Sequence, residues 1–301
     1  MADDERRAGG GAPVAASVNL GDLDRLSGRL GFCDEDRREL LGHAAQLTPA
    51  DWADVDRAAT ALRGILGQWD MARPDVFADF PDQEGRPRGL IPMLALLRGV
   101  PAVREYHARR GIAEADTIAS LADLGQQAWV YRQVFNEFGL DTQGWLTTAW
   151  AGAFFWLGRL QFNLLPFRGQ HVISVHIPQT GPLPPEEVDE AFGRAWRFFD
   201  THFPDAPATA FHCDSWLLDP RLSQVLHPQS NLARFQRRWR LINTGKEADA
   251  SVLYFVFRHR PRPGEQLDRR GLPRRTSLER AVLDHLDAGG HWYSYTGLID
   301  P

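Results

Sequence analysis

A change in hydrophobic periodicity near Gly152 constrains the fold more than any other feature of this sequence. Before it, apolar residues recur at the three- and four-residue spacing of a buried helix face, as at Leu40 and Ala44. After it, short runs rich in aromatic and β-branched residues alternate with helical segments, a pattern typical of a mixed sheet covered by helices. The 301 residues suffice for two ordinary domains. We therefore predict an α+β protein with a helical domain over residues 18–150 and a mixed α/β sheet domain over residues 151–301.

Turn and capping residues divide both halves into predicted elements. Residues 154–167 and 172–177 flank Arg168-Gly169-Gln170, and strand-like runs on either side of a short glycine-containing turn predict a β-hairpin. Residues 211–218 and 252–258 predict two further strands because each is a short run rich in apolar residues. Helices are expected over residues 116–138 and 184–203, over residues 222–239 with an interruption at His227-Pro228, and after the capping box that begins at Thr276.

Charge and cysteine content exclude several classes of protein. A net charge of −5 offers no basic face of the kind that nucleic-acid binding needs. The two cysteines, Cys33 and Cys213, are too few for a disulfide framework and fit a reducing compartment. The most apolar run, residues 149–157, is too short to span a bilayer, and residues 1–17 are typical of a disordered tail. We expect a cytoplasmic protein with no membrane span and no nucleic-acid partner.

Several short motifs follow one another in a distinctive order in the second half. They are residues 157–162 (LGRLQF), 176–178 (HIP), 213–220 (CDSWLLDP) and 230–231 (SN), the last followed by Phe235. This order resembles a family of bacterial acyltransferases that combine a helical N-terminal domain with a GNAT-like C-terminal domain. The resemblance extends from about Gly152 to Gly290. It implies an enzyme that transfers an acyl group from a thioester donor to an amine, carried by a small molecule or a peptide.

One loop departs from the pattern of typical GNAT enzymes, which hold pyrophosphate on the backbone N–H groups of a glycine-rich loop. Residues 178–185 stand where the resemblance places that loop, and their prolines lack the N–H donors. We therefore expect Gln179, Thr180 and Gly181 to contact the donor in a different manner. Free acyl-CoA and the phosphopantetheine arm of an acyl carrier protein are both candidate donors.

A predicted basic helix offers a second set of donor contacts. Ser230 at its start is most simply a helix cap, but the same helix start, with Asn231, is also a candidate site for a phosphate or the pantetheine amide. Arginines on a helix usually form a solvated face, and they also suit the acidic surface of a carrier protein. The arginines concerned are Arg234, Arg237, Arg238 and Arg240.

Three side chains near the ends of predicted strands are candidates for catalysis. His176 is a candidate general base because imidazole titrates near neutral pH, although a buried histidine bonded to backbone would fit the same pattern. Cys213 is a candidate nucleophile or an inert core residue, as most unpaired cysteines are. Ser215 either donates a hydrogen bond to the thioester oxygen or satisfies a bend of the backbone. The adjacent His212, Cys213 and Asp214 point alternately to opposite faces of a strand, so we expect no metal there.

The mechanism that the resemblance favours is direct attack of the amine on the thioester. Direct attack needs a base and an oxyanion donor, but no covalent enzyme intermediate. Two alternatives stay open. One is a thioester hydrolase or transferase that forms an acyl-enzyme on Cys213 with His176 as its base. The other is a non-catalytic binding module on a GNAT-like scaffold.

Overall fold

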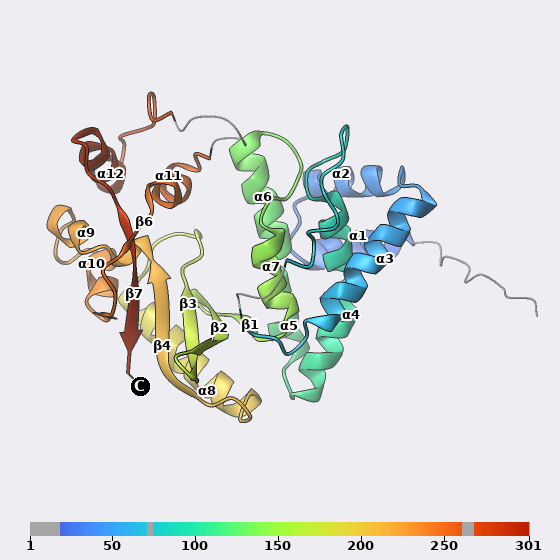
Figure 1. The fold of residues 1–301 in the computed structure, drawn as a ribbon, viewed down its shortest axis with the longest axis horizontal. Coiled ribbons are helices and arrows are strands. Elements are labelled where there is room, and N and C mark those ends of the chain that lie inside the picture. Colours follow the sequence, from blue (N-terminus) through green and yellow to red (C-terminus); the bar gives the residue numbers. More distant parts are fainter. Residues whose placement is uncertain (1–18, 71–74, 261–267, 301) are drawn as a thin grey trace, which may run out of the picture.

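The computed structural model describes residues 19–70, 75–260 and 268–300, so the predicted tail over residues 1–17 lies outside the described residues. The helices that precede Gly152 gather at one end of the molecule, and the sheet with its covering helices forms the other (Figure 1). This arrangement confirms the predicted α+β fold class. Among the described residues, no helix is both long enough and apolar enough to cross a membrane.

The first part of the chain packs around one apolar core. Helix α4 is buried along most of its length and contributes the largest share of that core. Helix α3 begins after Thr48, whose side chain forms a capping box with Asp51. The helices before Gly152 are α1 (Leu20–Arg29), α2 (Asp34–Ala44), α3 (Pro49–Gly64), α4 (Leu90–Arg109), α5 (Glu114–Leu121), α6 (Asp123–Phe135) and α7 (Gln143–Trp150).

The helix predicted over residues 116–138 is in fact two helices, α5 and α6, which meet at Ala122. The backbone N–H of Gly125, in the first turn of α6, donates to the carbonyl oxygen of Leu30 at 3.0 Å. A Cβ on Gly125 would lie 2.2 Å from the carbonyl carbon of Gly31, so only glycine allows α6 to approach this backbone. The prediction was wrong because the apolar periodicity continues across the break.

The sheet has the strand order β1-β2-β3-β4-β7-β5, with β6 paired to β7. Neighbouring strands are antiparallel except β3 and β4, which run parallel. The hairpin of β2 and β3 confirms one prediction, but residues 154–167 form two strands, because the chain reverses at Gly158 with φ 76°. The strands are β1 (Phe154–Leu157), β2 (Leu160–Phe167), β3 (Gln170–His176), β4 (Ala208–Ser215), β5 (Arg240–Leu241), β6 (Lys246–Glu247) and β7 (Tyr293–Ile299).

The parallel strands β3 and β4 separate at their carboxyl ends. Their last paired residues are Ser174 and His212, yet β3 continues to His176 and β4 to Ser215. The ends beyond this pair are not joined to each other by ladder hydrogen bonds. Backbone groups that leave a ladder must find other partners, so the divergence creates a place where a ligand can bind between two strands.

Helix α8 (Pro185–His202) connects β3 to β4 and covers one face of the sheet, behind the strands in Figure 1. Its Phe192 packs edge-on against Phe211 of β4, with ring centroids 4.6 Å apart. The interface is one apolar core, which also contains Cys213. The remaining elements after β4 are a 3-10 helix (Trp216–Leu218), α9 (Pro220–Val225), α10 (Asn231–Gln236), α11 (Asp249–Phe257) and α12 (Ser277–Asp287).

The strand predicted over residues 252–258 is wrong, because these residues belong to helix α11. Val252 and Leu253 are buried in a third apolar core, together with residues of α12. A short apolar run fits a buried strand and a buried helix equally well, so its periodicity alone does not decide between them. The strand that completes the sheet beside β4 is instead β7, which the sequence pattern did not predict.

Candidate active site

A cavity of about 880 Å³ lies where β3 and β4 separate. Its walls come from α6 and α7 of the helical part, from the ends of β3 and β4, and from α11 and α12. The predicted site residues that line it are His176, Gln179, Thr180, Gly181, Ser215, Ser230 and Asn231. Residues far apart in the sequence therefore meet in one cavity between the two halves of the chain.

His176, the last residue of β3, is held by Asn163 of the neighbouring strand. The Nε2 atom of His176 lies 2.6 Å from Oδ1 of Asn163, while Nδ2 of Asn163 donates to the carbonyl of Leu164 at 2.8 Å. Because Oδ1 can only accept, Nε2 of His176 carries the hydrogen, and Nδ1 keeps a lone pair. Burial lowers the pKa of His176 to about 3, so the ring is neutral near pH 7. The expectation that this histidine titrates near neutral pH is therefore wrong.

Cys213 does not share the cavity with His176. The two side chains lie on opposite faces of the sheet, since Cys213 belongs to the core under α8 and His176 lines the cavity. Cys213 is 0% exposed, and burial raises the pKa of its thiol, which keeps it protonated. The geometry therefore does not support a nucleophilic role for Cys213, and the acyl-enzyme alternative loses its Cys–His pair.

The two serines act as caps and also line the cavity. The Oγ of Ser215 accepts a hydrogen bond from the backbone N–H of Leu217 at 3.1 Å, which caps the 3-10 helix. The Oγ of Ser230 accepts from the N–H of Ala233 at 3.3 Å and caps α10. A serine that accepts a hydrogen bond still has its own O–H to donate. Neither cap therefore prevents a contact with a bound ligand.

Arg159, in the turn between β1 and β2, fastens the proline-rich loop that follows β3. Its Nε donates to the carbonyl of Pro182 at 2.7 Å, Nη1 to Pro178 at 3.2 Å and Nη2 to Gly181 at 2.6 Å. No carboxylate of the described residues forms a salt bridge with this guanidinium, and burial lowers its pKa. On the other side of the loop, the Gln179 amide donates to a backbone carbonyl of α11. The sequence pattern included Arg159 in a motif but did not predict this contact.

Comparison with known proteins decides the family. A profile described as "N-acyltransferase N-terminal domain" matches residues 21–152, and one described as "GNAT-like C-terminal domain" matches residues 154–299. The crystal structure of a mutant acyltransferase in complex with octanoyl-CoA is 35% identical, with a TM-score of 0.84 over 96% of this chain and 91% of that chain. The chain belongs to this acyltransferase family.

Further solved acyltransferases agree with this assignment. One, in complex with decanoyl-CoA, is 34% identical with a TM-score of 0.84, and the match covers 96% of this chain and 90% of that chain. Another, in complex with decanoyl-CoA and teicoplanin, is 35% identical with a TM-score of 0.83, covering 96% and 91%. No curated protein matches the sequence. The family resemblance drawn from the motif order is therefore confirmed, and the chain is a GNAT-type N-acyltransferase.

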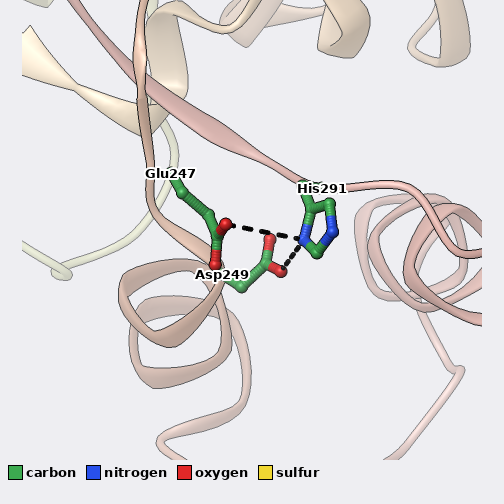
Figure 2. Close-up of side chains that lie close together, drawn as sticks. All are labelled: Glu247, Asp249 and His291. Atoms are coloured by element: carbon green, nitrogen blue, oxygen red, sulfur yellow. Dashed lines mark hydrogen bonds and ion pairs between the residues drawn. The ribbon is translucent and has the colours of Figure 1, made fainter.

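One group of side chains in the described part of the acyltransferase has atoms close enough to share a metal ion. Glu247, Asp249 and His291 place their ligand atoms within 4.8 Å of one another (Figure 2). Nδ1 of His291 lies 2.8 Å from Asp249, and the other Asp249 oxygen accepts from the backbone N–H of Trp292 at 2.7 Å. The hydrogen bond to Asp249 raises the pKa of His291. These bonds account for the arrangement, which ties α11 to the start of β7.

Proposed function

We propose that this acyltransferase moves an acyl group from acyl-CoA to an amine by direct attack. The observation that carries the proposal is the opening between β3 and β4, whose ends are not paired with each other and face a cavity that also contains His176. A thioester bound there would meet both backbone groups and a neutral imidazole. The solved relatives bound to octanoyl-CoA and decanoyl-CoA support a CoA thioester with a medium-length chain as the donor.

In the proposed reaction, the amine nitrogen attacks the thioester carbonyl, a C–N bond forms and the C–S bond breaks. The lone pair on Nδ1 of His176, acting directly or through water, accepts the proton that the amine loses. The CoA sulfur leaves as a thiolate and takes up a proton. The hydroxyl of Ser215 or a backbone N–H at the separated strand ends donates to the developing oxyanion.

Donor binding is assigned to Gln179, Thr180 and Gly181 and to Ser230 and Asn231, all of which line the cavity. The hydrogen bonds from Arg159 to the loop carbonyls support this assignment, because they fix the loop and bring a positive charge beside it. A carrier protein as an alternative donor stays a prediction.

The helical part, proposed as a separate domain over residues 18–150, supplies the acceptor side of the cavity. Its contribution comes from α6 and α7, which line part of the cavity. A solved relative in complex with decanoyl-CoA and teicoplanin supports an amine-bearing small molecule or peptide as the acceptor class. The cytoplasmic location inferred from the cysteine content stays part of the proposal.

The test is a transfer assay with decanoyl-CoA as donor and teicoplanin as the first acceptor probe. Released CoA thiol is measured by a colorimetric reagent, and the product is identified by mass spectrometry. Direct attack predicts an amide product and an enzyme of unchanged mass. Accumulation of protein carrying a decanoyl group would contradict direct attack, and failure to bind any acyl-CoA would contradict the choice of donor.

A further inference from the structure

A buried carboxyl group lies in the acceptor-side wall of the cavity. Asp123 is the first residue of α6, lines the cavity and is 2% exposed. Acidic side chains are almost never this buried without a paired cation. Among the salt bridges of the described residues, none involves Asp123. The carboxyl group therefore needs an explanation that the fold alone does not supply.

The hydrogen bonds of Asp123 come from neutral donors only. Its Oδ2 accepts from Nε1 of Trp145 at 3.1 Å, and its Oδ1 accepts from Nε2 of Gln127 at 3.3 Å. Both partners are neutral donors, so each carboxyl oxygen already acts as an acceptor. Burial raises the pKa of this carboxyl group, and the hydrogen bonds from neutral donors oppose that rise. A cation bound beside Asp123 would favour the charged carboxylate.

A second polar group beside Asp123 is also incompletely bonded. Gln161 is 4% exposed and lines the cavity, and its Nε2 has no hydrogen-bond partner among the described residues. Its amide opposes the rise in the pKa of Asp123 that burial causes, so the two groups interact. Gln161 is paired in register with His176, and the ring of Trp145 lies 4.7 Å from the His176 ring. These side chains form one continuous wall.

We propose that Asp123 binds the positively charged amine group of the acceptor before transfer. An ammonium group would supply the missing cation for the carboxylate. It loses one proton to solvent before the attack, and the imidazole accepts the second proton as the C–N bond forms. The inference rests on the proposed function, since it names the part of the cavity that recognises the acceptor. It predicts that charged amines bind better than uncharged molecules of the same shape.

The test compares hexylamine with 1-hexanol in calorimetric titrations of the full-length enzyme near pH 7. The wild-type enzyme is expected to bind hexylamine more tightly by roughly 10-fold or more, the factor that one hydrogen bond between charged groups contributes. The isosteric variant Asp123→Asn is expected to lose this preference. The control is Glu84→Gln, an exposed acid outside the cavity, which should keep it.

Each outcome decides the inference. A wild-type enzyme without a preference for hexylamine overturns it, and this measurement does not depend on the folding of any variant. A folded Asp123→Asn variant that keeps the full preference also overturns it. Binding of decanoyl-CoA, measured on the same samples, tests the proposed function separately from the inference about Asp123. A wild-type enzyme that does not bind decanoyl-CoA contradicts the proposed function, whatever its preference between hexylamine and 1-hexanol.

Discussion

The imidazole of His107 donates a hydrogen bond to the carbonyl oxygen of Gly152, at the point where the helical part of the chain passes into the sheet. The Nε2···O distance is 3.1 Å, and Nδ1 lies 2.9 Å from the hydroxyl of Thr117. Since a carbonyl only accepts, Nε2 carries the hydrogen and Nδ1 is left as an acceptor beside the Thr117 hydroxyl. His107 is 0% exposed, so this neutral ring joins α4, α5 and the junction before β1 inside the protein.

This arrangement predicts a loss of stability in acid. Burial lowers the pKa of His107 to about 4, below the value near 6.5 of an exposed histidine. The unfolded chain therefore binds a proton first, and the free energy of unfolding should fall as the pH drops from about 6.5 towards 4. Urea unfolding at several pH values measures this slope. In His107→Gln the slope should be shallower, while His227→Gln, at an exposed histidine, should leave it unchanged.

Replacement of His176 tests the proposed base. His176→Ala should lower turnover by the ~10²–10⁴-fold that the loss of a general base costs, with little change in acyl-CoA binding. His227→Ala is the matched control, because His227 is exposed and lies outside the cavity. Since the pKa of His176 is about 3, its own titration should not limit the rate near pH 6. Near-wild-type turnover in a folded His176→Ala enzyme would remove His176 from the mechanism.

Local sequence patterns predicted the parts of this fold that local chemistry determines. Alternation along the strand placed Cys213 on the face opposite His212 and Asp214, but it did not relate Cys213 to His176, which the structure puts on opposite faces of the sheet. The glycine turn before Gln170 gave the β2–β3 hairpin. The short apolar run in α11 was ambiguous, and β7 carries no apolar run that distinguishes it, because most of its residues are only half-buried.

The contacts that make the site were beyond sequence reasoning because they join distant segments. Asp123 lies 22 positions from Trp145 along the chain, and Arg159 lies 22 positions from Gly181. No periodicity or motif links such pairs. The sequence pattern identified polar residues at strand ends, such as His176 and Ser215. It missed Asp123 at the start of α6 and Arg159 in the turn between β1 and β2.

Replacement of Cys213 separates direct attack from a covalent mechanism. Cys213→Ala should retain most of its turnover, because the buried thiol has no route to the thioester. The free energy of unfolding should fall by roughly 0.5–3 kcal/mol, the usual range for a core truncation. Turnover is followed by CoA release, and stability by urea unfolding. An inactive but folded Cys213→Ala enzyme would restore the acyl-enzyme alternative.

Replacement of Arg159 tests whether the proline-rich loop binds the donor. Three carbonyls from Pro178 to Pro182 accept from one guanidinium, so Arg159→Ala should free the loop and remove a positive charge from the cavity wall. We expect weaker decanoyl-CoA binding by at least about 10-fold, equivalent to one charge-assisted hydrogen bond, with a smaller effect on turnover at saturating donor.

Arg159→Lys should restore little of the affinity, because a single ammonium does not present donors in the planar fork that reaches three separated carbonyls. Arg197→Ala, at an exposed arginine of α8, is the control for loss of charge alone. Calorimetric titration with decanoyl-CoA measures all three variants, and equal affinities in the wild type and Arg159→Ala would show that the donor binds without this loop.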